Sequence, residues 1–148
     1  MRFKRQPIYV QAFHFDVSER REAAGIGVQL HKLLPEEIDQ LHLSIPEGGC
    51  ALRIEIPFDF VPPQEHFAIS GIMKQLIIIE GFDGTESDLP ADAVKKLSRP
   101  IIELIETLTY EITTLSLDHA VNLNFVAKNE KIEDLDNYEE DKSTKETE

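Results

Sequence analysis

The chain is poor in residues that usually mark a compartment or a chemistry. Its 148 residues include one cysteine, Cys50, and no tryptophan. A single cysteine excludes an intrachain disulfide and a zinc site built on cysteine pairs, and it favours a reducing compartment. The longest apolar run, Leu76-Ile77-Ile78-Ile79, is too short to cross a bilayer. Residues 1–16 lack the continuous apolar core of a signal peptide. We therefore expect a cytoplasmic protein.

Positive charge is also scarce. Lysine and arginine number 15 against 28 aspartates and glutamates, which leaves a net charge of −13. Nucleic acids and anionic membranes are both bound through basic surfaces. The composition therefore argues against nucleic acid and against membranes as partners.

The motifs that would indicate catalysis, a metal or a cofactor are missing. No HExxH, GxSxG or P-loop pattern occurs, and Gly25-Ile26-Gly27 lacks the third glycine of a dinucleotide-binding loop. Cys50 has no basic neighbour in the sequence that would activate it. No metal-ligand spacing relates the five histidines, His14, His31, His42, His66 and His119. We predict a protein that is not an enzyme and binds no metal or cofactor.

The strongest positive signal is a pair of long predicted strands, 50–60 and 65–80, joined at Pro62-Pro63. The first strand alternates between an apolar and a charged face, whereas both faces of the second are apolar. The expected apolar faces are Leu52, Ile54, Ile56, Phe58 and Phe60 on the first strand, and on the second Phe67, Ile69, Met73, Ile77 and Ile79 opposed by Ala68, Ile72, Leu76 and Ile78.

Two shorter strands are predicted before this pair. Residues 8–16 alternate, with Tyr9, Phe13 and Phe15 on one face, and residues 26–30 set a second face with period two. Residues 33–47 are ambiguous, because Leu34-Pro35-Glu36-Glu37 could open a helical turn. The strand alternative for this stretch rests on the alternation of Leu41, Leu43 and Ile45.

From Leu89 onward the apolar spacing becomes that of an amphipathic helix. Proline is not tolerated deep inside a straight helix. We therefore expect Ser98 as the N-cap with Pro100 in the first turn, and residues 91–97 as a short preceding turn. One long helix kinked at Pro100 is the alternative. The apolar stripe consists of Val94, Leu97, Ile101, Ile105, Leu108, Ile112 and Leu115.

The last residues, 128–148, differ in composition from the rest. Acidic residues outnumber lysines there, and only Ile132, Leu135 and Tyr138 could dock on a core. Such a segment buries too little apolar area to offset the entropy of ordering it. We predict one domain over residues 1–127 and a mostly disordered acidic tail over residues 128–148.

A sheet that is apolar on both faces needs two covers. The predicted helix supplies one of them. The second face favours either a subunit interface or a groove that holds an extended apolar polypeptide, and the residues alone leave both open.

Four landmarks across residues 6–127 carry a resemblance to a known fold. They are Ile8-Tyr9 with the alternation up to Phe15-Asp16, the aliphatic strand 26–30, the glycine-containing strand end 76–84, and Leu123-Asn124-Phe125. In this order they resemble the bacterial export chaperone SecB, and more closely an uncharacterised family of Gram-positive proteins with the SecB-like fold. The resemblance implies an α+β fold, a four-stranded antiparallel β-sheet followed by a long helix, that assembles as a dimer or tetramer.

The resemblance also implies a function. SecB-like chaperones hold extended apolar segments of unfolded polypeptides along grooves between sheet and helix. Phe67 is the strongest candidate, because an aromatic side chain offers a large contact area. The groove positions that transfer are Ile26, Val28, Leu30, Phe67, Ile69 and Met73, the last of which replaces a polar residue of SecB.

The acidic residues through which SecB contacts the SecA motor are only partly matched. Asp16 agrees, but Ala12 and Ser70 stand where SecB has acids, which puts contact with SecA in doubt. We predict a non-enzymatic cytoplasmic chaperone for unfolded polypeptides. The alternative is a structural or regulatory adaptor whose apolar faces serve only homo-oligomerisation.

Overall fold

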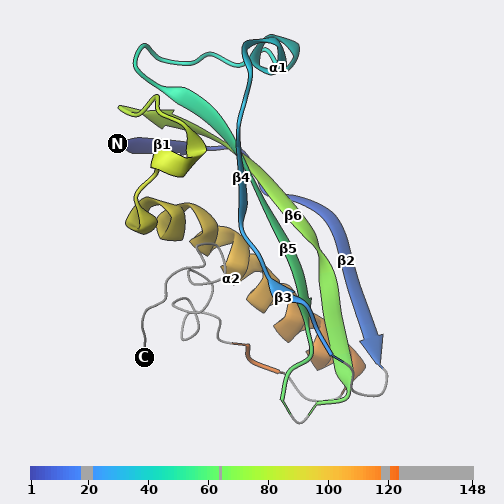
Figure 1. The fold of residues 1–148 in the computed structure, drawn as a ribbon. Helices are drawn as coiled ribbons and strands as arrows, with labels where there is room; N and C mark the ends of the chain where they lie inside the picture. Colours follow the sequence, from blue (N-terminus) through green and yellow to red (C-terminus); the bar gives the residue numbers. More distant parts are fainter. Residues whose placement is uncertain (18–21, 64, 118–120, 124–148) are drawn as a thin grey trace.

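The computed structural model describes residues 1–17, 22–63, 65–117 and 121–123. An elongated antiparallel sheet carries one long helix, α2, against one face (Figure 1). The predicted tail, 128–148, lies outside the described residues. The elements are β1 Arg2–Arg5, β2 Tyr9–Val17, β3 Gly25–Ile26, β4 Gln29–Lys32, α1 Pro35–Gln40, β5 Cys50–Phe60, β6 Phe67–Glu80, the 3-10 turn η1 Glu86–Asp88, and α2 Ala91–Ser116.

The α+β prediction is confirmed, but the sheet has six strands and not four. Strands β5 and β6 form the centre, β1 and β2 both pair with β6, and β3 and β4 both pair with β5. The predicted strand 8–16 forms β2, and a break separates it from β1, an additional strand that was not predicted. The predicted strand 26–30 is broken into β3 and β4. Pro7 lies in the first break and has no N–H for a ladder bond. At the second break Pro57 accepts a bond from Gly27 N at 3.0 Å but has no N–H to return.

The connection 33–47 takes the helical alternative. Pro35–Gln40 forms α1, and the Glu37 carboxylate accepts the Leu34 backbone N–H at 2.7 Å. The stretch with Leu41, Leu43 and Ile45 forms no strand. None of the helices in the described part of the chain is long and apolar enough to cross a membrane.

A bulge in β2 corrects one predicted face. The register shifts between Val10 and Ala12, so Tyr9 pairs with Lys74 on one side of the bulge and Phe13 with Gly71 on the other. The extra residue reverses the alternation. Tyr9 is therefore 63% exposed, while Phe13 and Phe15 pack against the core. The prediction that these three aromatics share a face is wrong for Tyr9.

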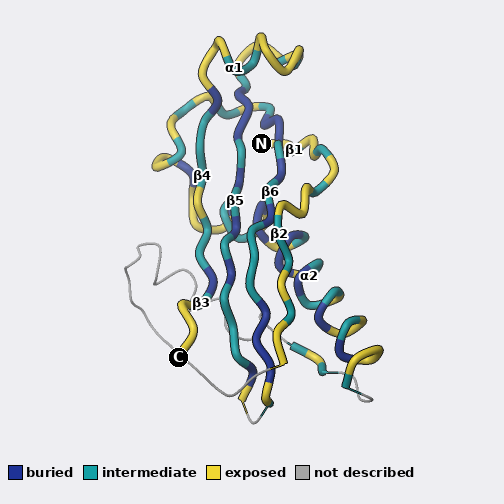
Figure 2. Tube along the Cα trace, turned by 90° about the vertical axis from the view of Figure 1, so that its right-hand side faces the viewer, coloured by how far each residue is buried: buried dark blue, intermediate teal, exposed yellow. Residues whose placement is uncertain are grey.

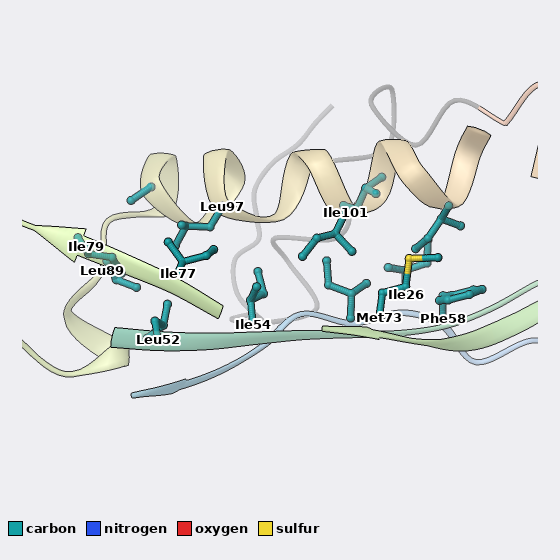
Figure 3. Packing of buried hydrophobic residues seen from close by; sticks show 14 of the residues in the cluster. Ile26, Leu52, Ile54, Phe58, Met73, Ile77, Ile79, Leu89, Leu97 and Ile101 are labelled. Atoms are coloured by element: carbon teal, nitrogen blue, oxygen red, sulfur yellow. The ribbon is translucent and has the colours of Figure 1, made fainter. Parts of the chain in front are cut away.

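The core lies between α2 and the face of the sheet that it covers, called here the inner face. Leu52, Ile54 and Ile56 of β5 are almost fully buried there, as are the predicted inward residues of β6. Leu97, Ile101 and Ile105 of α2 complete the layer from the other side (Figure 3). The buried residues run along β5 and β6, whereas α1 and much of β2 are exposed (Figure 2). The apolar faces predicted for β5 and β6 are confirmed on this side of the sheet.

Gly71 allows the backbone of β2 and the Phe58 ring to come close to β6. A Cβ at this position would overlap the Ala12 carbonyl and lie 2.9 Å from the Phe58 ring. The Phe13 residue pairs with Gly71, and its ring lies 5.8 Å from the Phe58 ring. Close packing around this position explains why a residue without a side chain stands in the middle of β6.

Gly71→Ala is expected to lower the free energy of unfolding by about 1–3 kcal/mol, because β2 must move away from β6 to admit the methyl group. Urea unfolding followed by circular dichroism measures the loss. Gly27→Ala is the matched control, since its added Cβ would meet only Pro57 at 3.7 Å, an ordinary contact. Equal effects of the two substitutions would contradict the close-packing explanation.

Helix α2 runs without interruption from Ala91 to Ser116, so the alternative of one long helix is the one that forms. The predicted N-cap at Ser98 is wrong. Ser98 is buried inside the helix and its hydroxyl donates to the Lys95 carbonyl at 3.2 Å. Pro100 lies in the tenth position of the helix and cannot donate to the carbonyl four residues earlier, that of Lys96.

Arg5 of β1 takes over that missing hydrogen bond. Its guanidinium Nη2 donates to the Lys96 carbonyl at 2.7 Å, and Nη1 donates to the Leu97 carbonyl at 3.2 Å. Nη1 also donates to Gln75 Oε1 at 3.3 Å, while Gln75 Nε2 donates to the Gln6 carbonyl at 2.7 Å. Partial burial of the guanidinium lowers the pKa of Arg5. One network thus links the break between β1 and β2 to the proline turn of α2.

Candidate functional site

The structure brings the six predicted groove residues together on the inner face, but most of them lie in the core. Val28 and Leu30 are half-buried at its margin, beside β5. Figure 3 shows Ile26 and Met73 on the sheet, on the side of the layer that faces α2. The four buried positions are Ile26, Phe67, Ile69 and Met73, between 0% and 6% exposed. The margin with Val28 and Leu30 is therefore the accessible part of the predicted groove.

Phe67 packs against a second aromatic ring at a tilt of 38°. Its ring lies 5.2 Å from that of Phe15 across the β2–β6 pair. Phe67 is 1% exposed, so the core already buries its large apolar area and leaves none of it for a client.

The C-terminal half of α2 turns two threonines toward the core. Thr109 and Thr113 are fully buried there, as is Ile105, and each threonine hydroxyl donates to the carbonyl four residues earlier at 2.8 Å. The Thr113 hydroxyl also accepts the Val121 N–H at 2.9 Å. Leu115, predicted to belong to the buried stripe, is instead 83% exposed. Two threonines can face the core because their hydroxyls bond to their own helix.

The opposite face of the sheet, called here the outer face, is also partly apolar, as predicted. Ala68 and Ile78 are buried, and Ile72 and Leu76 are half-buried. Charged residues, which the prediction of this face left out, interrupt these apolar positions. Glu55 accepts from Arg53 Nε at 3.1 Å and lies 3.9 Å from Lys74 Nζ. The sequence signal for this feature is the place of Lys74 between two apolar residues of the same face.

A cavity of about 560 Å³ lies between α1 and the adjacent end of the sheet. His31 and Glu37 stand close to it, with Nε2 and Oε1 3.0 Å apart. The hydrogen bond from the Leu34 backbone, and next the bond with His31, lower the pKa of Glu37. The lining residues are His31, Lys32, Leu33, Leu34, Pro35, Ile38, Ile45, Gly49, Cys50, Ala51 and Glu86.

Cys50 opens into this cavity as a buried thiol. Burial raises the pKa of Cys50, and the nearby Lys32 only partly opposes this effect. A thiol with a raised pKa is a poor nucleophile at neutral pH. Within the described ranges, no three His, Cys, Asp or Glu side chains are grouped so that they could hold a metal ion.

Comparison with known proteins gives the family. The family described as "Protein of unknown function (DUF1149)" matches residues 1–125. The chain belongs to the DUF1149 family. No curated protein matches it.

Two solved structures share the fold of this DUF1149 protein. A protein of unknown function from Streptococcus agalactiae has a TM-score of 0.71 and 24% identity, over 84% of this chain and 98% of that one. A SecB-like chaperone from Mycobacterium tuberculosis, solved in complex with a ChAD peptide from the HigA1 antitoxin, has a TM-score of 0.50 and 18% identity, over 83% of this chain and 90% of that one. The predicted SecB-like fold and the likeness to an uncharacterised family are confirmed.

Proposed function

We propose that this DUF1149 protein is a cytoplasmic chaperone that holds extended apolar segments of unfolded polypeptides without catalysing a reaction. The mycobacterial protein of the same fold is a SecB-like chaperone and was solved with a peptide. The observation in this chain that carries the proposal is the half-buried apolar margin of the inner face, with Val28 and Leu30 next to the core.

In this proposal Val28 and Leu30 contact the client directly. Leu30 pairs with Ile54 of β5, so the two residues lie beside a fully buried row. Ile26, Phe67, Ile69 and Met73 belong to the buried core of the same face. An extended client adds apolar contacts along the margin, and a continuous apolar strip binds many sequences because burial is not directional.

Val28→Asp is expected to weaken the suppression of client aggregation about tenfold, since a carboxylate at the margin would have to be desolvated against an apolar client. The assay follows light scattering of a reduced, unfolded client at increasing ratios of chaperone. Gln29→Asp is the matched control, because Gln29 is the next residue, is exposed and pairs with Glu55 on the outer face. Full activity of Val28→Asp in a folded protein would refute the margin as the client site.

A second function, that of an adaptor that only self-associates, is favoured by different residues. Val10 and Val17 on the edge strand β2 are 39% and 63% exposed, and Leu115 lies uncovered on α2. Edge strands with exposed apolar residues readily pair with another chain. We expect a dimer or tetramer in either case. The same Val28→Asp variant separates the two functions. If the protein is a chaperone, the variant keeps its mass in multi-angle light scattering and loses client binding. If it is an adaptor, even the unsubstituted protein does not suppress client aggregation.

A further inference from the structure

The outer face of the sheet combines apolar and basic side chains in an otherwise acidic protein. Strand register sets them side by side: Lys4 pairs with Ile78, and Arg53 pairs with Leu76. Lys74 follows between Leu76 and Ile72 on the same face, since residues two apart on a strand share a face. We call this surface the outer patch, made of Lys4, Arg53, Ile72, Lys74, Leu76 and Ile78.

The outer patch retains a surplus of positive charge. Arg53 and Lys74 share one carboxylate, that of Glu55. Lys4 adds a third cation beside Ile78 and is exposed. The whole chain carries a net charge of −13, so a basic surface here is a local exception. A complementary ligand is acidic with apolar side chains at intervals, because a purely acidic one would leave the half-buried Ile72 and Leu76 uncovered.

The chain itself contains a segment of this composition. Residues 132–140 read Ile-Glu-Asp-Leu-Asp-Asn-Tyr-Glu-Glu, with Ile132, Leu135 and Tyr138 three positions apart and acids between them. Each apolar residue can meet an apolar position of the patch while neighbouring carboxylates meet its cations. A tethered segment is present at a high effective concentration, so weak contacts suffice.

The geometry allows the segment to reach the patch on its own molecule. The described chain ends at Leu123, which packs against the core on the side of α2. Lys74 lies about 23 Å along β6 from the Phe67 end, at about 3.3 Å per residue. The connection from Leu123 to Tyr138 spans at most about 50 Å when extended, about twice the distance from the Phe67 end of β6 to Lys74.

We propose that residues 132–140 dock on the outer patch of the same molecule and cover the face of the sheet that α2 leaves open. The tail is then an intramolecular competitor for acidic or apolar partners of that face. The inner margin with Val28 and Leu30 stays accessible, so this inference does not depend on the proposed chaperone function.

A tryptophan in the tail reports on the docking directly. The chain has no tryptophan, so Tyr138→Trp in the full-length protein gives a single fluorophore at a conservative aromatic position. We expect acrylamide to quench it about threefold less efficiently at low salt than at about 1 M salt, where the Debye length falls to about 3 Å. Adding Lys4→Gln and Lys74→Gln should raise the quenching constant to its high-salt value.

Two controls make the result specific. Lys96→Gln with Arg99→Gln removes two charges from exposed residues of α2, on the other side of the molecule, and should leave the quenching unchanged. If the double patch variant misfolds, Lys4→Gln alone replaces it in the test. It changes one exposed residue, and its quenching constant should lie between the low-salt and high-salt values. Equal quenching at low and high salt would overturn the proposal, as would an equal effect of the α2 control. Loss of protection on dilution would also overturn it, because the tail would then dock on a second copy.

Discussion

Phe67→Asp is expected to unfold the protein and not merely to weaken a binding site. Phe67 is 1% exposed, and its ring centroid lies 5.2 Å from that of the tilted Phe15 ring. Truncation of a buried phenylalanine costs about 3–5 kcal/mol, and an aspartate in the same place adds the desolvation of its carboxyl group. Since single domains have only about 5–15 kcal/mol of stability, most of it should be lost. Urea unfolding followed by far-UV circular dichroism measures the change.

His66→Asp is the control for this substitution, because His66 is the adjacent residue and is exposed. It introduces the same side chain and should change the free energy of unfolding by less than about 0.5 kcal/mol. If Phe67→Asp unfolded at the same urea concentration as His66→Asp, Phe67 could not be part of the core. A loss of client binding in Phe67→Asp would therefore report unfolding, which is why Val28 is the better position for a test of function.

Arg5→Leu is expected to lower the free energy of unfolding by about 2 kcal/mol, the range for charge-assisted hydrogen bonds that leave unsatisfied partners behind. The substitution removes both donors to the carbonyls of Lys96 and Leu97, and it strips Gln75 Oε1 of its partner. Arg5 is partly exposed, so water can replace some of these bonds and keeps the loss from being larger. Arg2→Leu, on the same strand, is the control: the Arg2 side chain is 83% exposed and its ion pair with Glu80 is 3.9 Å long.

Pro100→Ala tests why Arg5 matters. An alanine at this position has an N–H that can donate to the Lys96 carbonyl, the group that Arg5 now satisfies. In the Pro100→Ala background, the loss caused by Arg5→Leu should fall by about 1 kcal/mol, which a double-mutant cycle measures as a coupling energy. Strictly additive effects of the two substitutions would show that Arg5 stabilises the protein independently of the proline turn.

The face assignments of the central strands followed from the sequence. Alternation over 50–60 and 65–80 predicted which side chains of β5 and β6 point inward, and Leu52, Ile54, Ile69 and Ile77 are all buried there. These face assignments depend on the local chain direction and on residue polarity, and both can be read from one sequence. The SecB-like fold was implied by the resemblance to SecB, and the structural comparisons confirm it.

The predicted site could be located only in part. The six residues named by the resemblance share one face of the sheet, yet Phe67 and Met73 are buried and Val28 is half-buried. The outer patch escaped prediction because Lys4, Arg53 and Lys74 come from three different strands. Their proximity follows from pairing across the sheet, which no local pattern contains.

The sequence by itself determined the long central strands, the amphipathic helix and hence the α+β architecture, because period and polarity act along one element. The tertiary structure decided that α2 continues through Pro100, because the donor that satisfies the Lys96 carbonyl belongs to Arg5, 91 positions before Lys96 in the chain. It also decided the bulge that reverses the side-chain alternation in β2, and it decided which apolar residues remain accessible. Those outcomes depend on contacts between distant segments, whose energies appear only once the segments are packed together.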